Sequence, residues 1–248
     1  MDKSAGRPYG SARPRAQEAT VLAESEQSDG DGGWFRRSSK PLRATKYMLR
    51  GSLAVVKEHR RAYLLLNLTY YGLIAAAMAY VAFDPGLQRS LLEAVGKAIG
   101  TGPMETIAGA YGGGRLLLAV VLTFTVNVIG GSFVYITLPS LIVPFSGLVL
   151  GAFRALLWGL MFSPTAVMGA GFFLLLPTIV LEGQGYVLAM LAAYVQGVAF
   201  VRPRSVGEKS HGRGYLEGLK RSARIYVLVA IVLVVAAVVE AVSVIFIM

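Results

Sequence analysis

Residues 172–189 read FFLLLPTIVLEGQGYVLA, an apolar stretch long enough to lie in a membrane that nevertheless contains the carboxylate Glu182. An isolated ionised group at bilayer depth is costly, so it normally faces a bundle interior or a wet cavity and has a partner. Pro177 and the glycines on either side of Gln184 predict a break in the backbone, which lipid tolerates only where protein or water satisfies the freed groups. The stretch therefore predicts a membrane protein, with Glu182 as its first candidate functional residue.

The composition of the whole chain agrees with a membrane location. Of the 248 residues, 55% are hydrophobic and 15% are charged, and the mean hydropathy is positive. A chain this apolar and this poor in charge does not resemble an ordinary soluble domain. We expect an all-α protein, a polytopic bundle of transmembrane helices.

The positive charge of the chain is unevenly distributed. The net charge of +10 collects before residue 62 and in residues 202–224, whereas the middle of the chain is nearly free of it. Such a distribution favours a role of the basic residues in membrane topology and in contact with anionic lipid over a role in nucleic-acid binding. We therefore expect anionic headgroups to bind at Arg43–Arg61 and Arg202–Arg224, protein partners in the membrane, and no nucleic acid.

Residue types that carry enzyme chemistry are scarce in this sequence. There is no cysteine, which excludes disulfides, Cys-ligated metals and a thiol nucleophile. His59 and His211 lie in basic, water-facing stretches without convergent ligands, so no metal site is expected. Motifs for a phosphate-binding loop, a two-histidine metal helix and a nucleophile elbow do not occur. We expect no catalytic residue, no cofactor and no enzyme activity.

Composition and periodicity divide the chain into three parts. Residues 1–40 are rich in Ser, Gly, Arg, Asp and Glu and lack apolar periodicity, which predicts a disordered N-terminal arm. Residues 41–61 place apolar side chains at helical spacing between basic ones, as an amphipathic interfacial helix does. A solvated lead-in to the first span is the alternative for that segment. Residues 62–248 form the transmembrane helical domain.

Apolar runs predict about five spans, at residues 62–83, 116–137, 145–162, 166–201 and 225–248. The segment 87–99 has one apolar face and is predicted to lie on the membrane. Residues 166–201 are too long for one untilted helix, and the interruptions at Pro177 and 182–185 predict a broken or re-entrant helix. If 145–162 is itself re-entrant, then 166–201 crosses twice or not at all.

Charge predicts the orientation of these spans. The basic residues before the first span and those after the fourth both indicate the cytoplasmic side by the positive-inside rule. An even number of crossings must separate them. Five spans then place the N-terminus in the cytoplasm and the C-terminus outside, in the cytoplasmic (inner) cell membrane.

Seven residues with an amide or a charged side chain lie within the apolar runs: Asn67, Asn127, Arg154, Glu182, Gln184, Gln196 and Glu240. Burying three ionisable groups separately costs more than pairing an arginine with a carboxylate, so we expect Arg154 to contact Glu182 or Glu240. Such a contact is either a structural ion pair or a polar site for a lipid headgroup, ion or proton. In the alternative, Arg154 reaches an interface and pairs with nothing. The candidate intramembrane polar site comprises Glu182, Arg154, Glu240, Asn127 and Gln184.

Four segments follow one another along the chain: TVNV at 125–128, a stretch through Gly147 and Gly151, LPTIVLE at 176–182, and AAVVEA at 236–241. The glycine pair has a spacing that permits close helix contact. In this order the segments resemble the stage II sporulation protein M family, over about residues 61–248. The resemblance implies a roughly five-span membrane protein with an Asn in one helix, a Pro-initiated segment ending in Glu, and a Glu in the last helix.

The chain departs from that family where the usual Pro-His-Gly is Pro177-Thr178-Ile179. This removes the family's membrane histidine and argues against a proton-handling role. In spore formers the resemblance implies an anchor or scaffold for cell-wall-degrading partners. We therefore expect an integral membrane scaffold or assembly partner without catalytic activity. The alternative is a transport component, a permease-like subunit or small transporter, with its polar site at Glu182. A membrane enzyme acting on lipid is least favoured.

Overall fold

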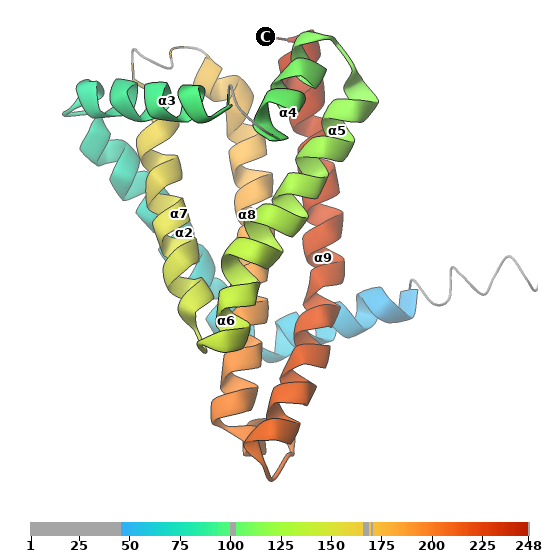
Figure 1. Cartoon of the computed structure of the whole chain (residues 1–248). Coiled ribbons are helices and arrows are strands. Elements are labelled where there is room, and N and C mark those ends of the chain that lie inside the picture. The colour runs from blue at the N-terminus through green and yellow to red at the C-terminus, as the bar shows by residue number, and fades with distance from the viewer. Residues whose placement is uncertain (1–45, 100–102, 166–168, 170, 248) are drawn as a thin grey trace, which may run out of the picture. The chain divides into compact units, whose positions relative to one another are not determined.

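The computed structural model describes residues 46–99, 103–165, 169 and 171–247. Every regular element in these ranges is helical, so the predicted all-α fold is confirmed (Figure 1). The predicted arm 1–40 lies outside the described residues. The chain divides into the units Met1–Tyr47 and Met48–Met248, and all that follows concerns the second unit.

Four helical segments in the described ranges are long and apolar enough to cross a membrane. They are α2 (Arg60–Val81), the run Leu116–Ile142, α8 (Gly171–Val201) and α9 (His211–Phe246). α7 (Ser146–Met161) is apolar but shorter, and it runs between the same two ends of the bundle (Figure 1). The predicted multi-pass helix bundle is thus confirmed, and the five predicted spans correspond in order to these five segments.

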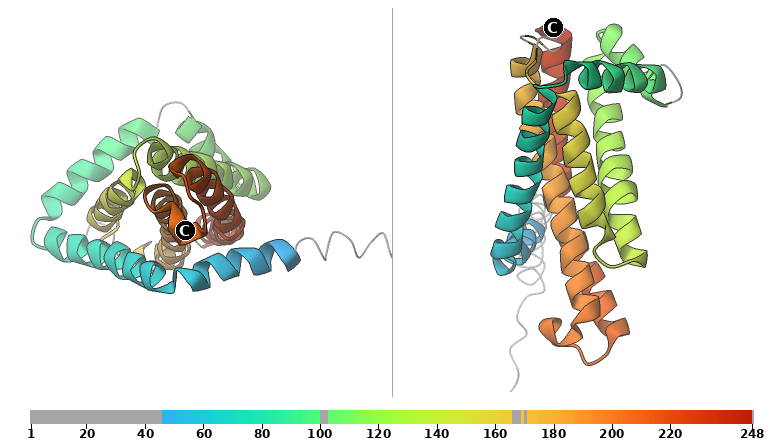
Figure 2. Two further views of the ribbon diagram at one scale, coloured as in Figure 1. Left: turned by 90° about the horizontal axis from the view of Figure 1, so that it is seen from below. Right: turned by 90° about the vertical axis from the view of Figure 1, so that its left-hand side faces the viewer.

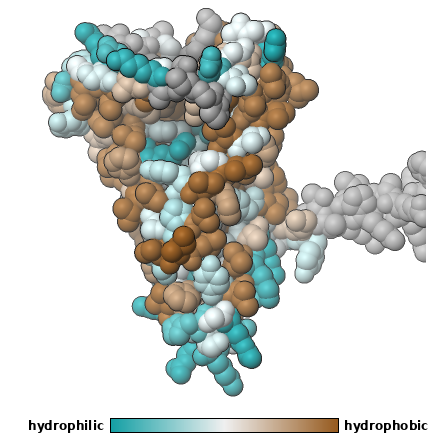
Figure 3. Space-filling model, viewed as in Figure 1, coloured by the Kyte–Doolittle hydropathy of each residue, from teal (hydrophilic) through white to brown (hydrophobic). Residues whose placement is uncertain are grey.

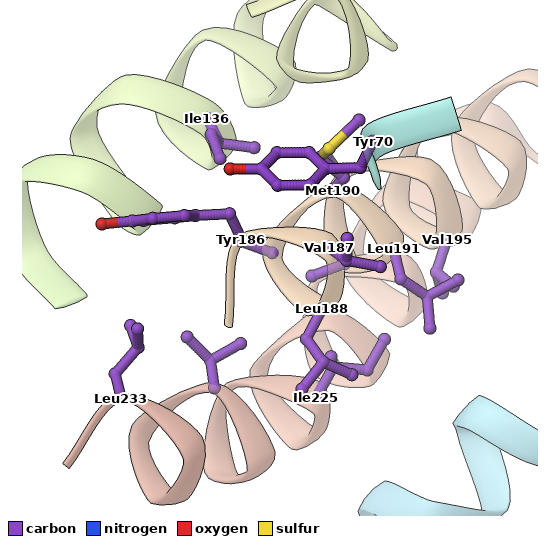
Figure 4. Packing of buried hydrophobic residues seen from close by; sticks show 14 of the residues in the cluster. Tyr70, Ile136, Tyr186, Val187, Leu188, Met190, Leu191, Val195, Ile225 and Leu233 are labelled. Carbon is purple, nitrogen blue, oxygen red and sulfur yellow. The ribbon is translucent and has the colours of Figure 1, made fainter. Parts of the chain in front are cut away.

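α8 is the central helix of the bundle. Residues 185–193 are all buried, as expected for a helix that is apolar all round. It packs along α9 and also contacts α2 and α7. Figure 4 shows part of this core, with Leu233 and Ile225 of α9 close to α8.

The surface between the two ends of the bundle is apolar. Figure 3 shows hydrophobic residues over the middle of one face and hydrophilic residues towards both ends. On α2, Leu64, Leu65 and Leu68 are each more than half exposed. A surface of this kind is satisfied by lipid, because a soluble monomer rarely exposes so much contiguous apolar area.

The break predicted within 166–201 does not occur in the described part of that segment. α8 is a continuous helix from Gly171 to Val201, with Pro177 inside it. Pro177 lies in the second turn of the helix, so its missing N–H removes a single helical bond close to an end. The prediction of a broken or re-entrant helix is therefore wrong for Gly171–Val201.

The glycines of this stretch have a different role from the one predicted. A Cβ at Gly183 would lie 3.0 Å from the hydroxyl oxygen of Tyr71. A Cβ at Gly185 would lie 2.5 Å from Leu233 Cδ2. These glycines therefore mark close contacts of α8 with α2 and α9, within an unbroken backbone.

The irregular helix lies in the second span instead. α5 (Leu116–Thr125) continues into the π-helix η1 (Val126–Thr137), and α6 (Leu138–Ile142) follows. π-Helices are rare and occur frequently at functional sites. η1 carries Asn127 and contacts α8. No pattern in the sequence predicted it.

α7 approaches its neighbours through small residues. Its buried positions are Gly147, Gly151, Ala155 and Gly159. A Cβ at Gly147 would lie 2.1 Å from the carbonyl oxygen of Ile136, and one at Gly159 would lie 2.4 Å from that of Ile74. The close helix contact predicted from the spacing of Gly147 and Gly151 is confirmed.

Two short helices, α3 (Pro85–Ile99) and α4 (Pro103–Gly112), lie at the end of the bundle where α9 also ends (Figure 1, Figure 2). α3 runs across the bundle, and its Gln88 is fully buried. Gln88 Nε2 donates to the carbonyl oxygens of Met161 and Ser163, at 2.8 and 3.0 Å. These bonds satisfy carbonyl groups at the end of α7 and hold α3 against it.

At the opposite end of the bundle, residues 48–58 are helical and contact α9. Ser52 Oγ donates to the carbonyl oxygen of Arg224 at 2.6 Å, and Val55 is buried. Met48 and Leu53 remain exposed. The interfacial position expected for residues 41–61 stays a prediction. It requires exposed apolar side chains that can enter the lipid, and Met48 and Leu53 are such side chains.

Candidate functional site

Glu182 and Tyr186 lie one helical turn apart on the same face of α8. Glu182 is 6% exposed and Tyr186 is fully buried. Both side chains reach residues of other helices, which makes this face of α8 the centre of the candidate site.

A chain of hydrogen bonds runs from α7 to Glu182. Arg154 Nη2 donates to the Tyr186 hydroxyl at 2.7 Å, and that hydroxyl donates to Asn127 Oδ1 at 2.7 Å. Asn127 Nδ2 donates to Glu182 Oε1 at 2.5 Å. Each of these bonds joins two different helices, so the chain fixes the register of α7, α8 and η1 relative to one another.

Two further polar side chains lie near Glu182. Glu240 of α9 and Tyr111 of α4 are close enough to it for the charges of both carboxyl groups to act on the Tyr111 hydroxyl. The Tyr111 hydroxyl also lies 2.9 Å from Thr123 Oγ1. Burial, and after it the charge of Glu240, raises the pKa of Tyr111 above its ordinary value. The Tyr111 hydroxyl therefore keeps its proton.

Hydrogen bonds join four of these side chains: Arg154, Tyr186, Asn127 and Glu182. Glu240 and Tyr111 lie within electrostatic reach of them, and we name all six, which come from five helical elements, the polar relay. Ionisable residues inside a membrane bundle are costly and are usually functional. The polar relay is therefore the candidate functional site.

The structure brings together four of the five predicted site residues: Asn127, Arg154, Glu182 and Glu240. The predicted direct contact between Arg154 and a carboxylate is wrong, because Arg154 forms no ion pair within the described part of the chain. Its guanidinium carbon lies 4.0 Å from the ring centroid of Tyr186 and 5.2 Å from that of Trp158. Hydrogen bonds link Arg154 to Glu182 through Tyr186 and Asn127.

A glycine in η1 explains this arrangement. A Cβ at Gly131 would lie 3.0 Å from Tyr186 Cε1 and 3.4 Å from Arg154 Nη2. The bare backbone of η1 therefore gives the tyrosine ring room beside the guanidinium. The face of an aromatic ring attracts a cation, which compensates part of the missing ion pair.

Gln184, the fifth predicted site residue, does not belong to the polar relay. Two residues after Glu182 it faces another side of α8, and its Nε2 donates to the Tyr63 hydroxyl at 2.6 Å. Asn67 bonds within its own helix, to the carbonyl oxygen of Tyr63. Gln196 is fully buried, and neither atom of its amide has a partner among the described residues.

Two members of the polar relay were not predicted from the sequence. Tyr186 had a usable signal, because residues four apart share a helix face and it lies four after Glu182. Tyr111 had none, since it lies in a separate short helix far from Glu182 in the chain. Its place in the relay depends on how α4 folds back against α5 and α9.

The described residues also define a hollow remote from the polar relay. It lies where α8 passes through η2 (Pro203–Val206) into α9, and its lining is Val201, Arg202, Pro203, Arg204, Ser205, Lys209 and His211. Within the described ranges, no three His, Cys, Asp or Glu side chains gather as metal ligands would.

No protein-family model, no curated protein and no solved structure matches the chain. The resemblance to the stage II sporulation protein M family therefore stays a prediction. The function has to be inferred from the chain's own residues and their geometry.

Proposed function

We propose that the protein is an integral membrane scaffold or assembly partner, in keeping with its resemblance to the stage II sporulation protein M family, and that it has no catalytic activity. The observation that carries this proposal is the length of α8 and α9. With 31 and 36 residues at about 1.5 Å each, they extend about 46 and 54 Å. A bilayer core is only about 30 Å thick.

The excess length forms a hairpin, which we define as residues 196–224. Figure 1 shows the two helices continuing beyond the ends of α6 and α7. Ser222 Oγ donates to the carbonyl oxygen of Ala192 at 2.7 Å. A Cβ at Gly214 would lie 2.3 Å from the carbonyl oxygen of Ala199. The hairpin is therefore tightly packed where it leaves the bundle.

The tip of the hairpin is basic and open to a partner. The exposed cationic side chains of the hairpin are Arg202, Arg204, Lys209, Arg213, Lys220 and Arg224. Complementary charge steers association and fixes specificity. A stiff basic element that projects from the bundle fits an acidic surface on a partner protein.

Co-purification in mild detergent after cross-linking in cells tests this proposal. The hairpin variant replaces Arg202, Arg204 and Lys209 with Gln. The remaining basic residues of the hairpin are kept so that the orientation of the protein in the membrane does not change. The matched control replaces the exposed residues Arg89, Lys97 and Arg115, at the other end of the bundle, with Gln. We expect proteins recovered with the wild type to be lost with the hairpin variant and retained with the control. Equal recovery with both variants contradicts the proposal, as does recovery of no partner with the wild type.

A transport component is the second candidate, and the polar relay favours it. Acidic residues inside a helix bundle commonly belong to ion or proton pathways. In proteoliposomes, a potassium diffusion potential should then drive a proton flux that Glu182→Gln abolishes. The control Glu93→Gln changes an exposed carboxylate of α3 and should leave the flux intact. Absence of any flux with the wild type contradicts proton transport.

A further inference from the structure

Arg154 lies in the middle of α7 without an anion in contact with it. It is the ninth of the 16 residues of α7, and it forms no ion pair within the described part of the chain. An arginine has five N–H groups. One of them, on Nη2, donates to a described residue, the neutral hydroxyl of Tyr186. Arg154 Nε is buried and has no partner among the described residues. The guanidinium therefore keeps unused donors as well as its charge.

Glu182 does not supply the missing anion, because two neutral groups lie between its carboxylate and Arg154. The Tyr186 hydroxyl gives its proton to Asn127 Oδ1, and Asn127 Nδ2 donates to Glu182 Oε1. The rings of Tyr186 and Trp158 attract the guanidinium, but a ring face leaves most of its N–H groups unbonded. A charge with unused donors is costly inside a bundle, so we expect a further acceptor beside Arg154.

Arg154 can be reached from the lipid side of the bundle. The other three side chains of its hydrogen-bond chain are buried, whereas Arg154 is half-buried. Figure 3 shows a hydrophilic area beside α7, within the otherwise apolar middle of this face. On α7, Leu150 and Leu157 lie about one turn away on either side of Arg154 and are also half-buried. A ligand that reaches the guanidinium from this side passes apolar side chains, so it needs an apolar part.

The length of α7 brings lipid headgroups closer to Arg154. At about 1.5 Å per residue, its 16 residues extend about 24 Å, whereas the core of a bilayer is about 30 Å thick. A bilayer thins beside a span that is shorter than its hydrocarbon core. Headgroups therefore lie nearer to the middle of α7 than to the middle of a full-length span.

We propose that Arg154 binds the oxyanion of an anionic amphiphile, a phosphate or carboxylate group carried on an apolar chain, from the lipid side of α7. The paired N–H groups of a guanidinium match two oxygens of either anion. Tyr186 and Trp158 hold the guanidinium in place, and the apolar chain of the ligand packs along α7 on Leu150 or Leu157. This inference goes beyond the scaffold role, since it requires no partner protein.

Quenching of tryptophan fluorescence by brominated lipids tests this site, because bromine quenches only at close range. The chain has two tryptophans, and Trp34→Phe leaves Trp158 as the reporter. The Trp158 ring centroid lies 5.2 Å from the guanidinium carbon of Arg154. In liposomes, brominated phosphatidylglycerol or ionised brominated stearate should bind beside Trp158 severalfold more strongly than brominated phosphatidylcholine. A preference for the phospholipid alone identifies a phosphate ligand, and a preference for stearate alone identifies a carboxylate.

Variants of the full Trp34→Phe chain assign the preference to one arginine. Arg154→Gln should remove it, whereas Arg115→Gln, which changes an exposed arginine just before α5, should keep it. The inference is wrong if the preference persists in Arg154→Gln. It is also wrong if neither anionic probe binds better than phosphatidylcholine to the chain that retains Arg154, an outcome that decides even when Arg154→Gln does not fold. These measurements fail or succeed independently of the co-purification and flux assays.

Discussion

Tyr186 joins the two halves of the polar relay, because its hydroxyl accepts from Arg154 and donates to Asn127. Its ring also lies beneath the guanidinium of Arg154. Tyr70 is equally buried, yet its hydroxyl has no partner in the described part of the protein. The two tyrosines therefore offer a matched comparison of a connected and an unconnected hydroxyl.

Tyr186→Phe should lower the free energy of unfolding by about 1–3 kcal/mol, since it leaves a buried amide oxygen and a guanidinium N–H unpaired. Tyr70→Phe should change it by less than about 0.5 kcal/mol, because no protein partner is lost. Circular dichroism during denaturation in detergent measures both. A loss with Tyr70→Phe as large as that with Tyr186→Phe would show that the hydrogen bonds of the relay contribute nothing measurable.

Sequence reasoning identified the costly members of the relay but not their partners. Asn127, Arg154, Glu182 and Glu240 were predictable because each interrupts an apolar run. The pairing of Arg154 was not, since it depends on which helix faces meet and on the space beside Gly131. An arginine can satisfy its charge on an aromatic face as well as on a carboxylate, and sequence spacing does not distinguish these outcomes.

At the scale of elements, Pro177 and the glycines at 183 and 185 misled the prediction for α8. A proline near a helix start and glycines at helix contacts resemble a helix break in sequence, because both situations select the same residues. The positions of Tyr71 and Leu233 next to those glycines show that they mark close helix contacts and not a helix break. By contrast, the surface helix over 87–99 was predictable, since its apolar face is local to the segment.

Gln88→Leu should loosen α3 from the bundle. The substitution removes both donors to the carbonyl oxygens of Met161 and Ser163, which are then left without those bonds. Hydrogen exchange measured by mass spectrometry should accelerate in α3 and stay unchanged in α8. Ser90→Ala, which alters only a local bond to Gly86, is the control and should leave α3 protected. Unchanged exchange in Gln88→Leu would mean that other contacts hold α3.

Gly147→Ala should destabilise the bundle by about 1–3 kcal/mol or more, because its Cβ would lie 2.1 Å from a backbone carbonyl that has little freedom to move. Gly72→Ala provides the control, since nothing lies within 4 Å of its Cβ position on α2. There alanine should be neutral or slightly stabilising. Melting temperatures in detergent compare the two, and equal values would show that α7 can move away from Ile136.

At the scale of the whole molecule, the predicted orientation rests on the distribution of charge. Ser90 on α3 and Ser210 before α9 lie at opposite ends of the bundle, and both are exposed (Figure 1). The basic hairpin predicts that Ser210 faces the cytoplasm. Given the order of the helices along the chain, we then expect Ser90 and the end of α9 to face the outside.

Single cysteines in this cysteine-free chain report the orientation directly. In intact cells, an impermeant thiol reagent should label a cysteine introduced by Ser90→Cys and not one introduced by Ser210→Cys. After lysis both should react, which controls for accessibility. Labelling at 210 without lysis reverses the orientation.

The π-helix η1 has a consequence for how this span tolerates changes in chain length. A π-helix holds roughly one more residue per turn than an α-helix. Deleting one residue between Val126 and Thr137 can therefore be absorbed by a return to regular α-helix, whereas the same deletion in α8 would rotate every later buried side chain away from its neighbours. A variant that lacks one residue of η1 should therefore keep the bundle, whereas a variant that lacks one residue in the middle of α8 should not.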